Sequence, residues 1–182
     1  QNATRQTHCL PCPAGSSCAQ GAAAPSACAK GSFTNTSMPK DACEPCAAGE
    51  YQDAEGATAC ERCPAGSSCP AGASAALKCD AGTYQDEQGR DSCKACEVGF
   101  ACAAGSTAPH ECAAGSMANA PSNADVCVLC QAGEWQNATR QTHCLPCPAG
   151  SSCAQGAAAP SACAKGSFTN TSMPKDACEP CA

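Results

Sequence analysis

The sequence predicts a series of small disulfide-rich modules that form an elongated tandem-repeat rod, with short β ribbons and turns and almost no helix. Three observations support this prediction: cysteine accounts for 22 of the 182 residues, large apolar side chains are scarce, and the sequence repeats itself. The hydrophobic fraction of 43% is mostly alanine and cysteine, since the chain has only three Phe, two Tyr, one Trp and three Met. With so little to bury, disulfides must take the place of an apolar core.

The repeat has a long and a short period. Residues 1–47 recur without a change as 136–182, so one long period runs from Gln1 to the next copy of that residue, Gln136. Inside it lies a step of about 17 residues, in which a cysteine is followed by a glycine and then usually by an aromatic residue. The aromatic residues at this place are Phe33, Tyr51, Tyr84, Trp135 and Phe168.

The cysteines divide the chain into modules that begin and end at Cys-x-x-Cys pairs. We expect the end of a two-Cys loop plus a four-Cys module at 1–42, a two-Cys loop at 43–59, four-Cys modules at 60–92 and 93–126, a two-Cys loop at 127–143, a four-Cys module at 144–177 and the start of the next loop at 178–182. The two-Cys loops pair Cys46 with Cys60 and Cys130 with Cys144. The four-Cys sets are Cys12, Cys18, Cys28 and Cys43; Cys63, Cys69, Cys79 and Cys93; Cys96, Cys102, Cys112 and Cys127; and Cys147, Cys153, Cys163 and Cys178. Cys9 and Cys181 are left over, and we expect both to be interrupted members of a longer array.

Three connectivities exist within a four-Cys set, and spacing alone does not choose among them. Pairing between neighbours, Cys63 with Cys69 and Cys79 with Cys93, is favoured because the segment from Cys79 to Cys93 has the length and the G-x-Y-Q-D motif of the two-Cys loop from Cys46 to Cys60. The interleaved alternative joins the first cysteine to the third and the second to the fourth, and it remains open.

A different use of the thiols is zinc binding in a reducing compartment, since two Cys-x-x-Cys pairs at 43–46 and 60–63 come near zinc-site spacing. The intervening cysteines fit no four-ligand grouping along the chain. Four N-x-S/T sequons, at Asn2, Asn35, Asn137 and Asn170, favour a secreted chain instead, and we predict that these asparagines carry glycans.

The motif C-x2-C-P-A-G-S-S-C, followed by C-x-A-G-T-Y-Q-D-x-x-G-x-x-x-C-x2-C, resembles the ephrin-receptor-like cysteine-rich repeat. It is similar in appearance to the cysteine-rich module of tumour necrosis factor receptors and to EGF-like modules. The resemblance covers essentially the whole chain, and it implies an extracellular rod of small modules. The alanine-rich linkers, such as GAAAPSA, and the unchanged long repeat depart from a receptor ectodomain, whose modules diverge.

Local structure follows from the glycines and prolines that punctuate the chain every few residues and disfavour long helices. The Ala-Gly after a cysteine predicts a tight turn in which glycine takes a conformation that other residues resist. We expect the aromatic residue that follows to pack over a neighbouring disulfide, and each module to contact only its neighbours along the stack.

Candidate reactive groups are few, and we expect no catalytic, cofactor or metal site. The histidines are His8, His110 and His143, and each fits a solvated loop position. The acidic residues Asp53, Glu55, Asp86, Glu87 and Asp91 could bind calcium, but no loop has the dense alternating carboxylates of a strong site. The pair Ser16 and Ser17 lacks the G-x-S-x-G elbow of a hydrolase.

These features together predict a structural protein and not an enzyme. The first expectation is a subunit of a secreted, glycosylated extracellular fibre, cell-surface hair or stalk that self-associates; the alternative is the stalk or ligand-binding region of a receptor or adhesin ectodomain. A cytosolic zinc protein is a third class. A net charge of −6 and the absence of a basic patch argue against a nucleic-acid partner, and no segment is long and apolar enough to span a membrane.

Overall fold

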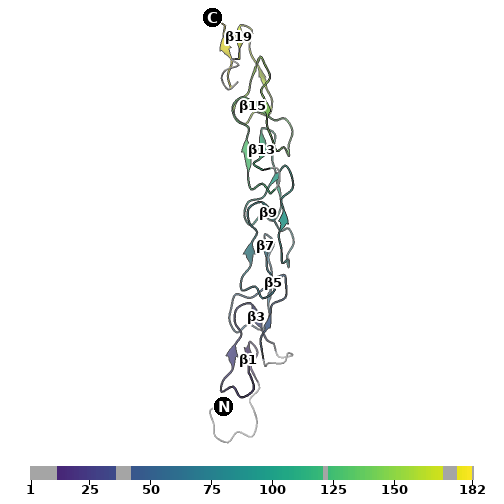
Figure 1. Ribbon diagram of the computed structural model, residues 1–182, viewed down its shortest axis with the longest axis vertical. Coiled ribbons are helices and arrows are strands. Elements are labelled where there is room, and N and C mark those ends of the chain that lie inside the picture. The colour runs from purple at the N-terminus through teal and green to yellow at the C-terminus, as the bar shows by residue number, and fades with distance from the viewer. Residues whose placement is uncertain (1–11, 36–41, 121–122, 170–175, 182) are drawn as a thin grey trace. The chain divides into compact units, whose positions relative to one another are not determined.

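The computed structural model describes residues 12–35, 42–120, 123–169 and 176–181. Two compact units make up the chain, one of Gln1–Cys79 and Gln85–Cys93 and the other of Asp80–Tyr84 and Lys94–Ala182. Each described part is built from β-hairpins between consecutive strands (Figure 1). The described residues contain no helix, so the prediction of small disulfide-rich modules with short β ribbons is confirmed.

The described residues of the first unit form four complete hairpins, and every strand in them is two residues long. They are β1 (Ser16–Ser17) with β2 (Ser26–Ala27), β3 (Ser32–Phe33) with β4 (Glu44–Pro45), β5 (Glu50–Tyr51) with β6 (Glu61–Arg62), and β7 (Ser67–Ser68) with β8 (Leu77–Lys78).

The described residues of the second unit form six such hairpins, in which β13 and β14 are three residues long and the other strands two. They are β9 (Thr83–Tyr84) with β10 (Lys94–Ala95), β11 (Phe100–Ala101) with β12 (His110–Glu111), β13 (Ser116–Ala118) with β14 (Cys127–Leu129), β15 (Glu134–Trp135) with β16 (Leu145–Pro146), β17 (Ser151–Ser152) with β18 (Ser161–Ala162), and β19 (Ser167–Phe168) with β20 (Glu179–Pro180).

A tight turn leads into each hairpin, and a glycine makes it. In the turn before β5, the Glu50 N–H donates to the Ala47 carbonyl over 3.0 Å, and Gly49 has a φ of 88°. This is the arrangement of a type II turn, whose third residue needs a positive φ that only glycine adopts without strain. We call the ten glycines at this place the turn glycines: Gly15, Gly31, Gly49, Gly66, Gly82, Gly99, Gly115, Gly133, Gly150 and Gly166.

Disulfides form most of the buried apolar interior. In the first unit, Cys63 and Cys69 are fully buried and pack with Ala73, and Tyr51 lies against this cluster. In the second unit, Ala101, Cys112, Ala118 and Ala124 form a similar cluster. The expectation that an aromatic residue packs over a neighbouring disulfide is therefore confirmed for Tyr51.

Successive hairpins are joined through their backbones, and the contacts reach beyond the nearest neighbour. The N–H of Gly31, before β3, donates to the Gln52 carbonyl of the next hairpin over 2.8 Å. A Cβ atom built on Gly31 would also overlap the carbonyl oxygen of Gly72, in the loop of the hairpin after that. The expectation that modules contact only their neighbours is wrong, because the absence of a side chain at Gly31 lets the loop of the next-but-one hairpin close on it.

Candidate functional site: the repeated hairpin

The repeated hairpin is the unit from which a functional surface must be built, and disulfides fix it in two ways. Four short bridges join cysteines six residues apart, just before and just after the first strand: Cys12–Cys18, Cys63–Cys69, Cys96–Cys102 and Cys147–Cys153. Six longer bridges close the hairpin loop itself over 14 or 15 residues: Cys28–Cys43, Cys46–Cys60, Cys79–Cys93, Cys112–Cys127, Cys130–Cys144 and Cys163–Cys178.

The structure thus pairs Cys63 with Cys69 and Cys79 with Cys93, which is pairing between neighbours and not the interleaved order. Cys181 is a free, exposed thiol, and Cys9 lies outside the described residues. The module boundaries assigned from the cysteine pattern stay a prediction. Because the bridges close many separate loops, they hold local shape without needing a large apolar core.

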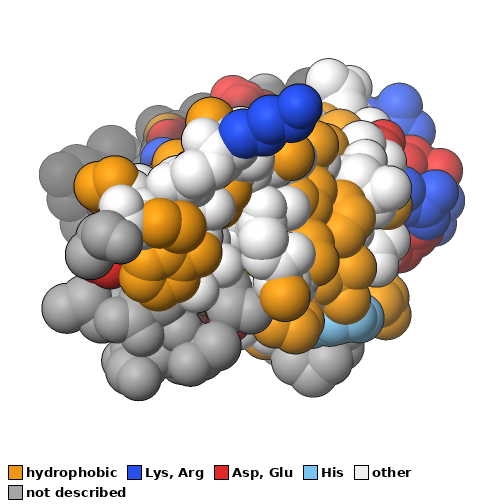
Figure 2. Space-filling model, turned by 90° about the horizontal axis from the view of Figure 1, so that it is seen from above, with side chains coloured by type: hydrophobic (Ala, Val, Ile, Leu, Met, Phe, Trp, Pro, Cys, Tyr) orange, Lys and Arg blue, Asp and Glu red, His pale blue; other side chains and the backbone are white. Residues whose placement is uncertain are grey.

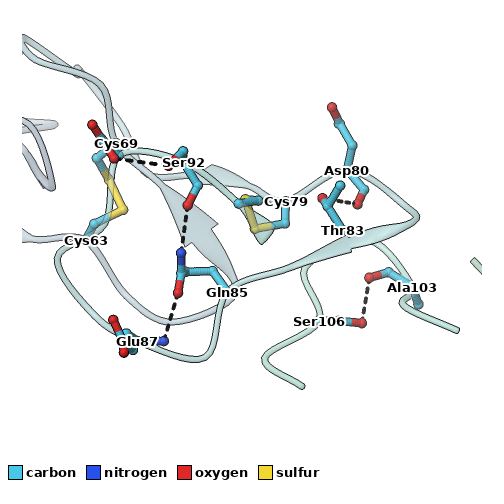
Figure 3. Close-up of a disulfide and its surroundings, with 12 residues drawn as sticks. Cys63, Cys69, Cys79, Asp80, Thr83, Gln85, Glu87, Ser92, Ala103 and Ser106 are labelled. Carbon is cyan, nitrogen blue, oxygen red and sulfur yellow. Dashed lines mark hydrogen bonds between the residues drawn. A yellow bond between two sulfur atoms is a disulfide. The ribbon is translucent and has the colours of Figure 1, made fainter. Parts of the chain in front are cut away.

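A buried glutamine organises the loop in three of the six longer bridges, those of Cys46–Cys60, Cys79–Cys93 and Cys130–Cys144, and sequence reasoning gave it no role. Gln85 is 2% exposed; its amide nitrogen donates to the Ser92 carbonyl over 2.7 Å, and its amide oxygen accepts from the Glu87 N–H over 3.1 Å (Figure 3). Gln52 and Gln136 make the same two bonds in their own loops. The signal was present in the sequence, because a glutamine follows the aromatic residue at Tyr51, Tyr84 and Trp135.

Threonine takes the place of glutamine after Phe33 and after Phe168, at Thr34 and Thr169. Thr34 is fully buried, and its hydroxyl donates to the Ser16 carbonyl of the preceding hairpin over 3.1 Å. No described buried side-chain oxygen or nitrogen lacks a hydrogen-bond partner. Hydrogen bonds therefore fix the buried polar side chains of the described residues in place.

Aromatic and charged side chains face each other across the hairpins. Tyr51 pairs with Glu61, and its hydroxyl donates to the Glu61 carboxylate over 3.0 Å. This hydrogen bond, together with the negative charge of Glu61, raises the pKa of Tyr51 above its usual value of 10. The Arg140 guanidinium lies over the Phe100 ring at 4.5 Å from its centre, which is cation–π geometry.

The polar surface has mixed charge. Arg90 forms an ion pair with Glu87, three residues before it. Lys and Arg side chains on the right of Figure 2 lie beside Asp and Glu side chains, while hydrophobic and uncharged side chains cover much of the same face. Among the described residues, no cluster of three or more His, Cys, Asp or Glu side chains could hold a metal ion, and this includes Asp53, Glu55, Asp86, Glu87 and Asp91. His110 and His143 belong to no such cluster, and His8 lies outside the described residues.

The predicted glycan sites fall in different surroundings. Asn137 is exposed and follows the buried Gln136, so its side chain is at the surface of the loop. Asn35 is half-buried, next to the buried Thr34. Asn2 and Asn170 lie outside the described residues. Glycosylation of these asparagines stays a prediction.

Comparison with known proteins gives one family. The family described as tyrosine-protein kinase ephrin type A/B receptor-like matches residues 31–76 and 115–160, two segments that together make up half of the chain. Each segment starts at a turn glycine and covers two complete hairpins and the first strand of a third. No curated protein sequence matches the chain. No helix in the described part of the chain has the length and apolarity of a membrane span.

Proposed function

Because the chain belongs to the ephrin-receptor-like cysteine-rich repeat family, we propose that it is part of an extracellular ectodomain, in which the stacked hairpins form the stalk of a receptor or adhesin. The described residues contain ten disulfides and only short strands. These disulfides support an oxidising compartment, since such bridges rarely persist in the cytosol. The observation that carries the proposal is the family match, which spans two complete hairpins in each segment. The role is mechanical spacing, and no reaction is assigned to it.

The arrangement of the hairpins suits a spacer. Each hairpin of the described residues has one bridge of its own, such as Cys46–Cys60 or Cys63–Cys69. Backbone hydrogen bonds such as Gly31 N–H to the Gln52 carbonyl and Gly115 N–H to the Gln136 carbonyl tie a hairpin to the one that follows it. The buried polar side chains of the described residues are all hydrogen-bonded, and cystine and alanine supply the buried apolar area. A chain of this kind keeps its local shape without a partner, which is what a stalk requires.

A fibre subunit is a second candidate, and one specific observation favours it. The segment 1–47 is repeated unchanged as 136–182. A filament needs equivalent contacts at regular intervals, and an unchanged repeat supplies them. In this reading the chain self-associates in the extracellular space, whereas a stalk stays monomeric.

Mass spectrometry of the chain, expressed with a secretion signal, tests the extracellular assignment. Without reduction we expect cross-linked peptides that join Cys63 to Cys69 and Cys79 to Cys93, and an N-glycan on Asn137. Free thiols with bound zinc would overturn the proposal in favour of a cytosolic metal protein.

Two variants of one residue provide the glycan control. Thr139→Ala destroys the Asn137 sequon without touching the asparagine, and Thr139→Ser keeps the sequon. The glycan mass should disappear in the first variant and remain in the second. If the peptide containing Asn137 has its own unmodified mass in each of the three proteins while the disulfides are intact, Asn137 is not a glycan site, and the predicted glycoprotein character must rest on the other sequons.

A further inference from the structure

The disulfides divide the chain into segments that carry a pull along it and segments that do not. A long bridge such as Cys79–Cys93 joins the two ends of the loop it encloses, so a pull passes through the sulfur atoms and bypasses residues 80–92. A short bridge such as Cys63–Cys69 bypasses only the first strand of its hairpin, β7, and the turn before it (Figure 3). The segment 70–78, which contains the second strand β8, is enclosed by no bridge.

Each of the four described hairpins with a short bridge contains such a segment. Each segment lies between the second cysteine of a short bridge and the first cysteine of the long bridge that follows. We call them the open segments: 19–27, 70–78, 103–111 and 154–162. Elsewhere between Cys12 and Cys178, only two residues separate neighbouring bridges, and these residues already lie in an extended strand such as β6.

The open segments contribute little to the buried interior. Ala73 is the only buried residue in the four of them, whereas the loops of the long bridges contain buried side chains such as those of Gln52 and Gln85. Leu77 is the largest apolar side chain of the segment 70–78, and it is 56% exposed. A region with few buried contacts and exposed backbone hydrogen bonds opens at a low cost in free energy.

Backbone hydrogen bonds to earlier hairpins hold the open segments in place. The Gly72 N–H donates to the Cys46 carbonyl over 2.8 Å, and the Gln52 N–H donates to the Ala73 carbonyl over 3.1 Å. The segment 154–162 makes the equivalent pair of bonds over 2.8 and 3.0 Å. In both hairpins, two residue pairs with the first strand complete the attachment. Since no bridge encloses an open segment, these non-covalent contacts must resist the whole of a pull along the chain.

We propose that tension opens the four hairpins with a short bridge, so that the chain lengthens in steps while the hairpins with a long bridge keep their loops. Ten peptide steps separate Cys69 from Cys79, so one open segment spans at most about 36 Å when it is drawn out. The bridges set this limit, because the enclosed loops add nothing to the covalent path. The inference rests on the proposed stalk function: such a stalk yields to a load by a fixed amount.

Single-molecule force spectroscopy tests the proposal on the full chain. The protein is held by peptide tags at its two ends, after free thiols have been alkylated to prevent disulfide exchange. The disulfide-bonded protein should lengthen in four steps, each of no more than about 36 Å. Reduction with dithiothreitol releases the enclosed loops as well, so the total extension should then exceed the sum of four such steps.

Two insertions of about five glycine and serine residues, placed in neighbouring hairpins, provide a matched pair. The first insertion follows Ser74, in an open segment, and should lengthen one step by about 17 Å. The second follows Asp91, inside the loop of the Cys79–Cys93 bridge, and should leave every step unchanged until the protein is reduced. Both insertion points are exposed, and disulfide mapping of each variant checks that the bridges have formed.

The proposal is overturned if the disulfide-bonded parent detaches from its tags without a step, or if its steps exceed the limit. It is also overturned if the two insertions change the steps equally, since the Cys79–Cys93 bridge would then not shield its loop from the pull. None of these outcomes affects the extracellular assignment, which is tested by the disulfide and glycan masses. Free thiols with bound zinc would instead overturn that assignment itself, whatever the chain does under tension.

Discussion

Replacing Gln85 by alanine should loosen one loop of the chain by an amount that the structure lets us estimate. Gln85 is buried, and its amide pairs with the Ser92 carbonyl and the Glu87 N–H. The alanine variant leaves both backbone groups unpaired. Each unsatisfied group costs about 1–3 kcal/mol, so the two together should lower the local free energy of opening by about 2–6 kcal/mol.

The loss should be confined to the loop, because the Cys79–Cys93 bridge holds its ends together. Amide hydrogen exchange, read by mass spectrometry on peptides from this loop, measures the opening directly. A loss of about 2 kcal/mol corresponds to exchange that is roughly 30-fold faster. Peptides that contain Gln52 and Gln136 serve as internal references, since the same bonds remain intact there.

Gln88→Ala is the matched control, because Gln88 is an exposed glutamine of the same loop. It should leave the exchange rates unchanged. Gln85→Thr should lie between the two, since threonine is the residue that other hairpins use at this place, at Thr34 and Thr169. If Gln85→Ala exchanges no faster than Gln88→Ala, the buried amide does not organise the loop and the reasoning fails.

Two further predictions test the stacking and the surface. Gly31→Ala should lower the free energy of unfolding far more than Gly72→Ala. The new Cβ at residue 31 would overlap the Gly72 carbonyl oxygen, whereas the nearest atom to a Cβ at residue 72 is 3.8 Å away. Equal losses of free energy in guanidinium unfolding would contradict the contact. In a Tyr84→Phe background, the absorbance titration of Tyr51 should shift to lower pH in Glu61→Gln, because the carboxylate that raises the Tyr51 pKa is gone. The raised pKa means that the protonated hydroxyl is the form stabilised by folding, so this contribution is present at neutral pH and is lost as pH rises through the Tyr51 pKa. An unchanged titration would show that Glu61 does not act on Tyr51.

Local structure was largely readable from the sequence, because cysteine and glycine recur at fixed spacings. The Ala-Gly pair before Tyr51 predicts the turn at Gly49, and the shared motif of the Cys46 and Cys79 segments favours the loop closure that both adopt. These features depend on residues within about one hairpin of each other. A pattern of single residues captures such features well.

The stacking of hairpins was not readable in the same way. Gly31 and Gly72 belong to next-but-one hairpins, and their contact is made by backbone atoms, which leave no side-chain signature. The buried glutamine was missed for a related reason, because a glutamine after an aromatic residue looks like an exposed polar position in a β ribbon. Only its repetition at Gln52, Gln85 and Gln136 indicates a constraint.

Comparing the turn glycines with the loop positions that contact them explains which positions in the repeat are free to vary. The turn position is occupied by glycine in all ten described hairpins. At six of these positions a Cβ would overlap a backbone carbonyl from the next-but-one hairpin. The loop position that supplies this carbonyl has the same left-handed φ, yet it is Asn123 in one hairpin and Arg140 in another, with φ of 55° and 60°. Strain alone would exclude side chains from both places equally. Only the turn position lacks side chains in every hairpin, so the stacking contact as well as the turn requires glycine there. The loop position can carry a side chain such as that of Arg140, which covers the Phe100 ring.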